Sequence, residues 1–407
     1  MVLFFLFHQV LSFFIVHIFD MKKIVIFGST GSIGTTLLNI IKKDKKNFNI
    51  ELISANSNYK KLIKQAKFFN VKNLIITDQK SFLKAKEIFK NKKINVYDNF
   101  ESFNKIFKNK KIDYTMCAIS GFQGLKPTLD IIKYTNTIAV ANKESIICGW
   151  NLIKKDLEKY KTNFIPVDSE HFSIWSLIGN SKANNCERVY LTASGGPFRK
   201  YPLHLLKSVT PQKALNHPNW TMGKKISIDS ATMMNKVFEI IEAKKIFDFK
   251  YNQLDILIHP QSYLHAIIKF DSGLTKLLIH DTNMTIPIFN SIYPQNDKKI
   301  NTKLLDIKTL NNLNLETIDK DRFPVVEIIK KLPDNDSLFE TVIVSANDNL
   351  VNRFLKKEIK FTDISRILLK VTNLNEFKKF KKIKPKNTEE VSKLANYVSV
   401  KINTMSI

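Results

Sequence analysis

The segment KIVIFGSTGSIGTTLL, residues 23–38, decides the predicted fold of the N-terminal part of this chain. The apolar residues 24–26 predict a buried strand, and the residues from Thr35 onward predict a helix. Between them, Gly28, Gly31 and Gly34 are spaced G-x-x-G-x-x-G, whereas the usual dinucleotide fingerprint is G-x-G-x-x-G. A glycine-rich turn between strand and helix lets backbone N–H groups approach a phosphate closely. From these residues alone, a phosphate site and a simple tight connection are both open.

Residues 21–148 predict an α/β domain of the Rossmann-like, dinucleotide-binding type. Short apolar runs alternate here with helical patterns, which is typical of parallel β-α-β units. The predicted strands are KIVIF, IELISA, NLIITD, DYTMCAI and NTIAVAN. Open sheets of this kind bind ligands at the carboxyl ends of their strands, which is where the glycine turn lies.

The rest of the chain predicts two further regions. Residues 149–300 predict a central α/β catalytic domain, with strands in NFIPVDSE, RVYLTASGG, KKISIDS and DILIHPQS that end in polar or glycine residues. Such polar strand ends are where α/β sheets build their sites. Residues 301–407 predict a linker and a C-terminal helical bundle, because Leu350, Val351 and Phe354 fall on one helical face.

Residues 1–20 form a hydrophobic leader, MVLFFLFHQVLSFFIVHIFD. The leader lacks a basic n-region and a small-residue cleavage site, and it contains His8, Gln9 and His17, which argues against a signal peptide or an anchor. Met21 opens MKKIVIFG, where an α/β domain would begin. We therefore predict that the leader is a misassigned start, with a membrane anchor as the alternative.

The chain of 407 residues has 64 Lys and Arg against 37 Asp and Glu, a formal net charge of +27. Such a balance can indicate nucleic-acid binding, but the lysines are spread along the whole chain and no nucleic-acid motif accompanies them. We predict a solvated basic surface that attracts an anionic substrate, with no nucleic-acid or membrane partner. Cys117, Cys148 and Cys186 show no disulfide or zinc spacing, which fits a reducing, cytoplasmic compartment.

The end of the second predicted strand bears on the choice of cofactor. At this point of a dinucleotide-binding sheet, an acidic residue accepts the 2′-hydroxyl of NAD. Here the strand ends at Asn56, Ser57 and Asn58. Two lysines, Lys60 and Lys61, follow. Because no acid is present to repel a 2′-phosphate, these residues predict NADPH rather than NADH.

Carboxylates near a predicted strand end indicate a divalent metal. In VDSEH we expect Asp168 and Glu170 to point to one face of a strand and Ser169 to the other, because side chains alternate along strands. Two carboxylates on one face repel unless a cation binds them, and all-oxygen ligation suits Mg²⁺ or Mn²⁺. A solvated loop is the alternative.

The segment SIDSATMMNKVFEIIEAKKIF strengthens the metal interpretation. We expect Asp229 or Ser230 to cap a helix on which polar side chains share one face through i, i+3 and i, i+4 spacing. That face can hold an anion and supply a further metal carboxylate, although a plain surface stripe has the same pattern. Its members are Asn235, Lys236, Glu239 and Glu242.

Two loops predict contacts with a phosphate. In TASGGPF, Ser194 and the two following glycines offer a hydroxyl and backbone N–H groups after a strand. In NHPNWTMG, His217 suits phosphate or hydroxyl recognition, and Trp220 and Gly223 lie in an irregular segment that resembles a lid. The alternatives are a capped turn and a packed aromatic.

The chain resembles the 1-deoxy-D-xylulose 5-phosphate reductoisomerase family in its ordered motifs GSTGSIG, ANKES, VDSEH, TASGGPF, NHPNWTMGKKISIDSATMMNK and IHPQS. The resemblance extends from Met21 nearly to the C-terminus, and this family's turn carries the G-x-x-G-x-x-G spacing. It implies a homodimeric enzyme that uses NADPH and Mg²⁺ or Mn²⁺. The implied reaction rearranges and reduces 1-deoxy-D-xylulose 5-phosphate to 2-C-methyl-D-erythritol 4-phosphate, in non-mevalonate isoprenoid precursor biosynthesis.

The resemblance also implies roles for individual residues. Asp168, Glu170 and Glu239 would hold the metal, and the implied catalytic residues are Lys143, Glu170, His217 and Glu239. The implied cofactor-binding residues are Thr30, Gly31, Ser32, Ile33, Asn58, Asn142, Glu144 and Gly223. The implied substrate-binding residues are Lys143, Ser169, Glu170, Ser194, His217, Ser230, Asn235, Lys236 and Glu239.

One departure from the family affects the cofactor site. The family commonly has Gly-Lys-Asn where this chain has residues 56–58, so Ser57 stands where a lysine would serve the 2′-phosphate and only Asn58 matches. Two other functions stay open at this point. One is another metal-assisted NAD(P)-dependent dehydrogenase of a phosphorylated substrate, and the other is a membrane-tethered basic binding protein.

Overall fold

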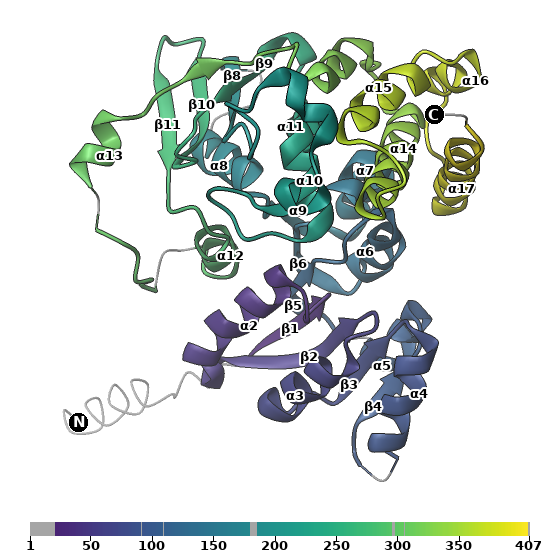
Figure 1. The fold of residues 1–407 in the computed structure, drawn as a ribbon. Coiled ribbons are helices and arrows are strands. Elements are labelled where there is room, and N and C mark those ends of the chain that lie inside the picture. The colour runs from purple at the N-terminus through teal and green to yellow at the C-terminus, as the bar shows by residue number, and fades with distance from the viewer. Residues whose placement is uncertain are drawn as a thin grey trace, which may run out of the picture.

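The computed structural model describes residues 21–405 except 91, 109, 180–184, 295–297 and 305. Two β-sheets lie at its centre, with helices packed around them (Figure 1). The hydrophobic leader, residues 1–20, lies outside the described residues, so its assignment stays a prediction. Within the described residues, no helix combines the length and the apolar character that a membrane crossing needs.

The first sheet contains seven parallel strands in the order β4-β3-β2-β1-β5-β6-β7. All the strands predicted between residues 21 and 148 are present, together with the short β4. The strand predicted in NFIPVDSE, β7, pairs with β6, so this sheet continues beyond residue 148. The strands are β1 (Lys22–Phe27), β2 (Phe48–Ala55), β3 (Asn73–Ile76), β4 (Asn95–Tyr97), β5 (Ile112–Cys117), β6 (Thr135–Val140) and β7 (Asn163–Pro166).

Helices cover both faces of the first sheet because its strands are apolar on both sides. Ile24 and Ile26 of β1 pack into one core with α2 (Ser32–Lys43) and α3 (Tyr59–Phe69). Val25 and Phe27 pack into another core with α6 (Leu125–Ile132) and α7 (Lys143–Tyr160). Successive strand side chains point to opposite faces, so a continuous apolar run is what a strand covered on both faces needs. The remaining elements here are η1 (Lys45–Asn47), α4 (Gln79–Ile88), η2 (Phe100–Ser102), α5 (Phe103–Phe107) and η3 (Phe122–Gly124).

The second sheet is mixed, with five strands in the order β11-β10-β8-β9-β12. β8 (Cys186–Ala193) and β9 (Leu254–Ile258) are strands, as predicted, and they run parallel. The strands β10 (Leu264–Phe270), β11 (Thr275–Ile279) and β12 (Glu316–Thr317) join antiparallel and were not predicted. The elements around this sheet are α8 (Ser169–Ile178), η5 (Leu203–Ser208), α9 (Pro211–Leu215), α11 (Met234–Phe247), η6 (Tyr251–Gln253), α12 (Thr285–Ile292) and α13 (Ile307–Asn311).

One predicted strand is wrong, because KKISIDS forms the helix α10 (Lys224–Thr232). The alternation of apolar and polar residues in so short a segment fits a strand and one side of a helix equally well. In the folded chain Lys225 and Asp229, four residues apart, form an ion pair of 3.0 Å along the helix. The helix also packs against α9, α11 and α14. Tertiary contacts therefore decide its conformation.

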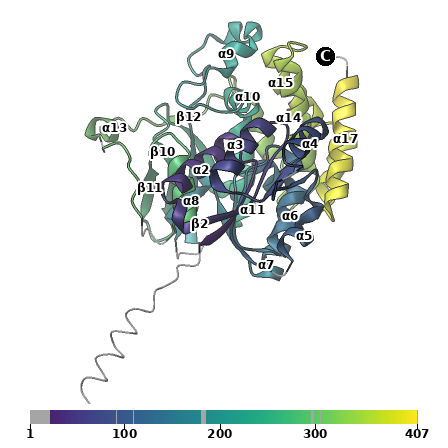
Figure 2. The ribbon, with the colours of Figure 1, turned by 90° about the horizontal axis from the view of Figure 1, so that it is seen from below.

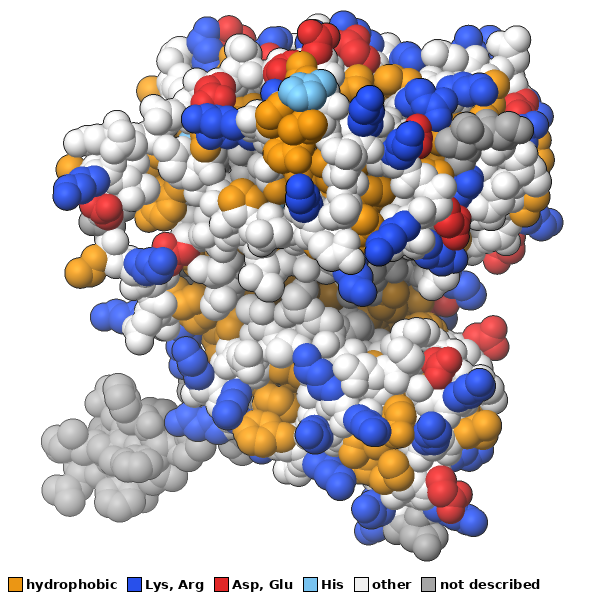
Figure 3. Space-filling view, viewed as in Figure 1, with side chains coloured by type: hydrophobic (Ala, Val, Ile, Leu, Met, Phe, Trp, Pro, Cys, Tyr) orange, Lys and Arg blue, Asp and Glu red, His pale blue; other side chains and the backbone are white. Residues whose placement is uncertain are grey.

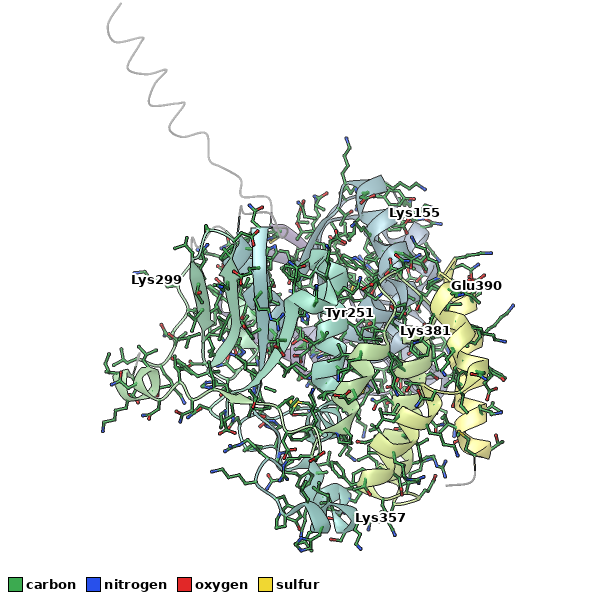
Figure 4. All side chains as sticks on the ribbon, turned by 90° about the horizontal axis from the view of Figure 1, so that it is seen from above. Lys155, Tyr251, Lys299, Lys357, Lys381 and Glu390 are labelled. Carbon is green, nitrogen blue, oxygen red and sulfur yellow. The ribbon has the colours of Figure 1, made fainter. Side chains whose placement is uncertain are left out.

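The C-terminal region is a helical bundle, as predicted, and α14 (Phe339–Leu355) is its central helix. It packs against α15 (Phe361–Val371) and α17 (Thr388–Thr404), and also against α7 and α10. The helix α17 lies along the outer side of the molecule, where Figure 4 labels Glu390, and α13 lies on the far side from it (Figures 2 and 4). The smaller elements are η7 (Pro324–Lys331), α16 (Asn375–Lys378) and η8 (Lys379–Lys382).

Basic side chains are scattered over both the upper and the lower part of the face shown in Figure 3. They do not gather there into one stripe of the kind that follows a nucleic-acid backbone. This distribution fits a solvated basic surface. The absence of a nucleic-acid partner stays a prediction.

The spacing of the glycines follows from the packing of the turn between β1 and α2. Gly28 has a φ of +71°, and a Cβ on it would clash with the carbonyl oxygen of Ala118 after β5. Gly34, in the first turn of α2, lies against the backbone of Ser29, so a side chain there would clash as well. The N–H of Gly31 donates to the carbonyl of Gly28 at 3.0 Å and closes the turn. The turn thus needs glycine at positions 28 and 34 for its own geometry.

We expect Gly28→Ala to lower the free energy of unfolding by about 2–4 kcal/mol, because the strain of a positive φ adds to a backbone clash. Gly273 is the matched control, since its φ is +84° but nothing lies near the position of an added Cβ. Gly273→Ala therefore reports the strain alone, about 1 kcal/mol. Urea unfolding measures both variants, and equal losses would contradict the close approach at Gly28.

Candidate active site

A cavity of about 660 Å³ lies at the carboxyl ends of strands from both sheets. Its wall includes residues that follow β1, β5, β6, β7 and β8, namely Gly31, Ala118, Ala141, Asp168 and Ser194. The irregular segment 217–223, which the sequence predicts as a lid, forms another part of the wall. Because open α/β sheets bind ligands at this edge, the cavity is the candidate active site.

Most of the residues selected from the sequence meet in this cavity. Thr30 and Asn58 are not part of its wall. Asn58 caps α3, where its side chain accepts the Lys61 N–H at 3.2 Å, and the Thr30 carbonyl accepts from the Lys61 ammonium at 2.9 Å. The selected residues that line the cavity are Gly31, Ser32, Ile33, Asn142, Lys143, Glu144, Asp168, Ser169, Glu170, Ser194, His217, Gly223, Ser230, Asn235, Lys236 and Glu239.

Three carboxylates converge in the cavity. One oxygen from each of Asp168, Glu170 and Glu239 lies within 4.8 Å of the other two. Asp168 directly precedes α8, Glu170 lies in the first turn of α8, and Glu239 comes from α11. The expected alternation along a strand was wrong, because β7 ends at Pro166 and a helix begins at Ser169. A helix start brings the two carboxylates to the same cavity instead.

Two lysines stand between these carboxylates. Lys143 Nζ lies 2.7 Å from Asp168 Oδ2 and 3.3 Å from Glu239 Oε1. Lys236 Nζ lies 2.8 Å from Glu170 Oε1 and also contacts Glu239. Both lysines are buried, so removing either would leave a carboxylate without its partner in a site largely shielded from water. Two positive charges against three negative ones leave the cluster attractive to a further cation.

Burial and neighbouring charges shift the protonation of the cluster. Burial, together with the neighbouring Glu170 carboxylate, raises the pKa of Glu239 to about 7. Burial opposes the charged form of Asp168 too, but the Lys143 ammonium outweighs it and holds the pKa of Asp168 well below its usual value. A cation bound among these groups would favour the charged form of each carboxyl.

The buried His171 contacts two members of the carboxylate cluster, Glu239 and Asp168. His171 Nε2 donates to the carbonyl of Glu239 at 2.9 Å, and its Nδ1 lies 3.6 Å from Asp168 Oδ2 and 3.8 Å from Glu242 Oε2. Burial lowers the pKa of His171, but the Glu242 and Asp168 carboxyls outweigh it and raise that pKa to about 9. Glu242, predicted on the polar face of its helix, thus lies against His171 and not in the cavity wall.

A break between two helices brings their polar residues into the cavity. The cap predicted at Asp229 or Ser230 was wrong, because both residues lie inside α10. Instead Met233, with a φ of 70°, separates α10 from α11. Ser230 from the first helix and Asn235 and Lys236 from the second therefore line the same cavity.

His217 joins the predicted lid segment to the loop after β8. Its Nδ1 accepts the backbone N–H groups of Asn219 and Trp220, so its Nε2 carries the proton and donates to Ser194 Oγ at 3.1 Å. The N–H of Gly196 donates to the same Ser194 Oγ at 3.0 Å. Burial lowers the pKa of His217 to about 4. The ring is therefore neutral at neutral pH.

The sequence analysis missed some residues of the cavity wall, among them His265 of β10. Its ring stacks on that of His280 with centroids 3.6 Å apart, and it meets the Trp220 ring edge-on at 6.2 Å. No motif marks His265 in LHAIIKF, because its role depends on the pairing of β10 with β8 and β11. Lys225 was missed for a similar reason, since it was assigned to a strand.

Models of one protein family match most of the chain. Residues 24–149 match 1-deoxy-D-xylulose 5-phosphate reductoisomerase, and residues 164–247 and 280–399 match C-terminal domains of that enzyme. A protein of this name from Pelagibacter ubique (strain HTCC1062) is 68% identical over 388 residues, which cover 95% of this chain and 100% of that protein. The chain belongs to the 1-deoxy-D-xylulose 5-phosphate reductoisomerase family.

Sequence identity and structural similarity to other reductoisomerases support this membership. That of Clostridium novyi (strain NT) is 36% identical over 386 residues, covering 94% of this chain and 100% of that protein. The solved reductoisomerase from Zymomonas mobilis, in complex with NADPH, is 31% identical with a TM-score of 0.83 and covers 94% of this chain and 98% of its own. A reductoisomerase solved with NADPH, fosmidomycin and magnesium is 27% identical, with a TM-score of 0.85 and coverage of 94% and 97%. Family membership sets aside a dehydrogenase of another family and a basic binding protein.

We expect His217→Gln to flatten part of the pH dependence of the stability of this chain. The folded chain keeps His217 neutral down to about pH 4, whereas an unfolded chain protonates it near about pH 6.5. The lowered pKa therefore contributes stability above about pH 6.5 that is lost as the pH falls through about 4. Urea unfolding at several pH values compares the variant with the wild type, and His204→Gln at an exposed position is the control. Identical profiles for wild type and His217→Gln would refute the neutral ring.

Proposed function

We propose that this chain uses the cavity to convert 1-deoxy-D-xylulose 5-phosphate to 2-C-methyl-D-erythritol 4-phosphate, with NADPH and Mg²⁺ or Mn²⁺, for isoprenoid precursor biosynthesis. As a member of its family, the chain is an NADPH-dependent oxidoreductase. The observation that carries the assignment is the meeting of three carboxylates, two lysines and the Ser194–His217 pair beside the glycine turn. Relatives have been solved with NADPH and with magnesium.

The proposed metal site consists of Asp168, Glu170 and Glu239. Their donor set is carboxylate oxygen alone and carries more negative than positive charge, which fits a hard divalent cation. When bound, such an ion polarises the carbonyl and hydroxyl oxygens of the sugar. Lys143 and Lys236 contact these carboxylates, so engagement of the carboxylates by a cation frees both ammonium groups for the substrate.

The proposed phosphate end of the substrate site combines Ser194, Ser230, Asn235 and Lys236. Ser194 Oγ already has a donor on each side, from His217 Nε2 and the Gly196 N–H. The same donors suit phosphate oxygens, which only accept hydrogen bonds at neutral pH. A neutral His217 contributes a directed N–H rather than a charge, and Lys236 contributes the charge. The lid segment that contains Trp220 would exclude water above this end.

Lys143 is the residue proposed to assist proton transfer or to stabilise charge in the reaction. Its Nζ donates to Asn235 Oδ1 at 2.7 Å and contacts Asp168 and Glu239. Burial lowers its pKa, but the Asp168 and Glu239 carboxylates outweigh burial and hold the pKa well above the usual value. Lys143 therefore stays an ammonium, which donates hydrogen bonds to sugar oxygens as negative charge develops on them. Ser169 and Glu170 complete the proposed substrate contacts.

The proposed cofactor site lies on the first sheet, at the start of α2. The extended Gly31 precedes this helix, whose first N–H groups are available to phosphate oxygens. We assign residues 21–148 to NADPH binding, 149–300 to metal and substrate binding, and 301–407 to a linker and helical domain. The proposed cofactor contacts are Thr30, Gly31, Ser32, Ile33, Asn58, Asn142, Glu144 and Gly223.

We expect turnover of 1-deoxy-D-xylulose 5-phosphate to require Mg²⁺ or Mn²⁺ and to fail without the three carboxylates. Asp168→Asn, Glu170→Gln and Glu239→Gln keep the side-chain shape but remove the charge, and each should lower kcat/KM by at least about 100-fold. Glu158→Gln, at an exposed position of α7, is the control. NADPH oxidation after chelation and after restoring the metal measures the requirement. Full turnover by the chelated wild type would disprove the metal site.

Lys61 is the proposed substitute for the lysine that the family has at position 57. Its Nζ donates to the Thr30 carbonyl at 2.9 Å and to Thr35 Oγ1 at 2.8 Å, so its charge lies on the glycine turn. Lys60 is exposed on the same helix and has no such contacts among the described residues. The positive charge that pairs with a 2′-phosphate would thus come from Lys61 in the first turn of α3 and not from the end of β2.

We expect NADPH to be preferred over NADH, with Lys61→Ala reducing the preference about fivefold, because an exposed charge contact contributes about 1 kcal/mol. The reduction should shrink at high salt. Ser57→Lys should raise the affinity for NADPH, and Lys60→Ala is the matched control with a smaller effect. The ratio of kcat/KM for the two cofactors measures all variants. A wild type that favours NADH, or an unchanged ratio in a Lys60→Ala plus Lys61→Ala variant, would count against this 2′-phosphate site.

We also propose that the chain forms a homodimer, as the family resemblance implies. The strand β11 supports an interface there, because it is an edge of the second sheet and its Leu277 is 46% exposed. An unpaired strand edge is a surface to which another chain can add. Light scattering after size-exclusion chromatography tests this assembly, and a monomer at all concentrations would contradict it.

A cytoplasmic location is the remaining proposal. The cysteines Cys117, Cys148 and Cys186 are all free and buried. Free thiols of this kind fit a reducing compartment. Cell fractionation tests the location, and recovery in the membrane fraction would favour a role for residues 1–20 as an anchor.

A further inference from the structure

A second charge cluster lies beside the cavity and joins three parts of the chain. Lys225 Nζ, on α10, lies 2.6 Å from Glu144 Oε1, 3.0 Å from Asp229 Oδ2 and 3.1 Å from Asp348 Oδ1. Glu144 is in the first turn of α7, and Asp348 is on α14 of the C-terminal bundle. Lys225, Glu144 and Asp229 line the cavity, whereas Asp348 is not part of its wall. Asp348 of the C-terminal bundle therefore contacts the cavity wall indirectly, through Lys225.

The charge balance makes the members of this cluster depend on one another. One ammonium faces three carboxyls, and the Glu144 and Asp229 side chains are only 8% and 2% exposed. Burial opposes the charged form of Glu144, but Lys225 outweighs it and holds the pKa of Glu144 below its usual value. A buried carboxylate that loses its cation is strongly destabilised or takes up a proton. The charge and place of Glu144 thus depend on where Lys225 is held.

Helix α14 fixes the cluster from the side opposite the cavity. Asn347, fully buried, donates from Nδ2 to Asp229 Oδ1 at 2.7 Å, and the next residue, Asp348, forms the ion pair with Lys225. The ring of Phe238 lies under Lys225 Nζ, with its centroid 5.2 Å away. Removal of the Asp348 carboxyl takes away the ion pair between Lys225 and α14. The long Lys225 side chain then gains freedom to move away from Glu144.

We propose that Asp348 is a positioning residue for the cofactor, which acts through Lys225 to hold the Glu144 carboxylate in the wall of the cavity. In this proposal the C-terminal helical bundle takes part in forming the NADPH site through Asp348, although Asp348 itself does not line the cavity. This inference rests on the proposed function, in which Glu144 contacts NADPH. It adds a residue outside the cavity, and a region of the chain outside the first sheet, to the determinants of cofactor affinity.

The first test measures NADPH affinity directly, by fluorescence titration without substrate. We expect Asp348→Ala to raise the Kd for NADPH by about three- to tenfold, with kcat at saturating NADPH changed by less than about twofold. Asp348→Asn keeps an oxygen within reach of Lys225 and should recover most of the affinity. Ser345→Ala is the matched control, since Ser345 is on the same helix but donates to the Ala395 carbonyl of α17. It should lower the Tm without changing the Kd.

The second test is a double-mutant cycle, which separates positioning from a general loss of packing. If Asp348 acts through Glu144, Asp348→Ala should have little further effect on the Kd in a Glu144→Gln background. Additive effects, or an unchanged Kd in Asp348→Ala, would overturn the proposal. If Asp348→Ala does not fold, Lys225→Met replaces it in the same cycle with Glu144→Gln. A wild type that binds NADPH but does not turn over 1-deoxy-D-xylulose 5-phosphate would contradict the proposed function and leave this cycle readable.

Discussion

The contacts of two buried lysines with three carboxylates are the constraint around which this molecule is arranged. Lys143 begins α7 after β6, Asp168 follows β7, and Glu239 comes from α11 beneath the second sheet. None of these charges is tolerated in the interior alone, because desolvation of an unpaired ion costs several kcal/mol. The elements that carry them must therefore end close together.

Such a cluster does not add much stability, and the apolar cores have to compensate for it. The two faces of the first sheet and the space between the second sheet and the C-terminal bundle are filled with apolar side chains that are almost fully buried. These cores hold the carboxylates close to one another although they repel. Burial, together with the neighbouring Glu170 carboxylate, raises the pKa of Glu239. A divalent cation at the proposed site would oppose both effects, because it favours the charged form of each carboxyl.

The proposed 2′-phosphate site differs from the family pattern in the position of one lysine. The lysine that this family commonly has at the end of the second strand is Ser57 here, and the first turn of the next helix contributes Lys61 to the same turn. The Lys61 ammonium lies against this turn, through Thr30 and Thr35, and is the cation proposed to bind the 2′-phosphate. Charge at a surface site has loose geometric requirements, whereas the carboxylate cluster of Asp168, Glu170 and Glu239 is closely constrained by its burial.

The sequence by itself determined the α/β class, the parallel strands of the first sheet and the helical C-terminal bundle, and all but two of the site residues selected from it line the cavity. The reason is that apolar periodicity and polar strand ends are local patterns, and the ordered motifs resemble one family over most of the chain. Only the tertiary structure decided the conformation of residues 224–230 and the antiparallel strands β10 to β12, because short alternating segments fit a helix and a strand equally well until they pack. It alone brought His265 to the cavity wall and Asp348 to Lys225 beside the cavity. Their positions depend on contacts between residues far apart in the chain, which no local pattern encodes.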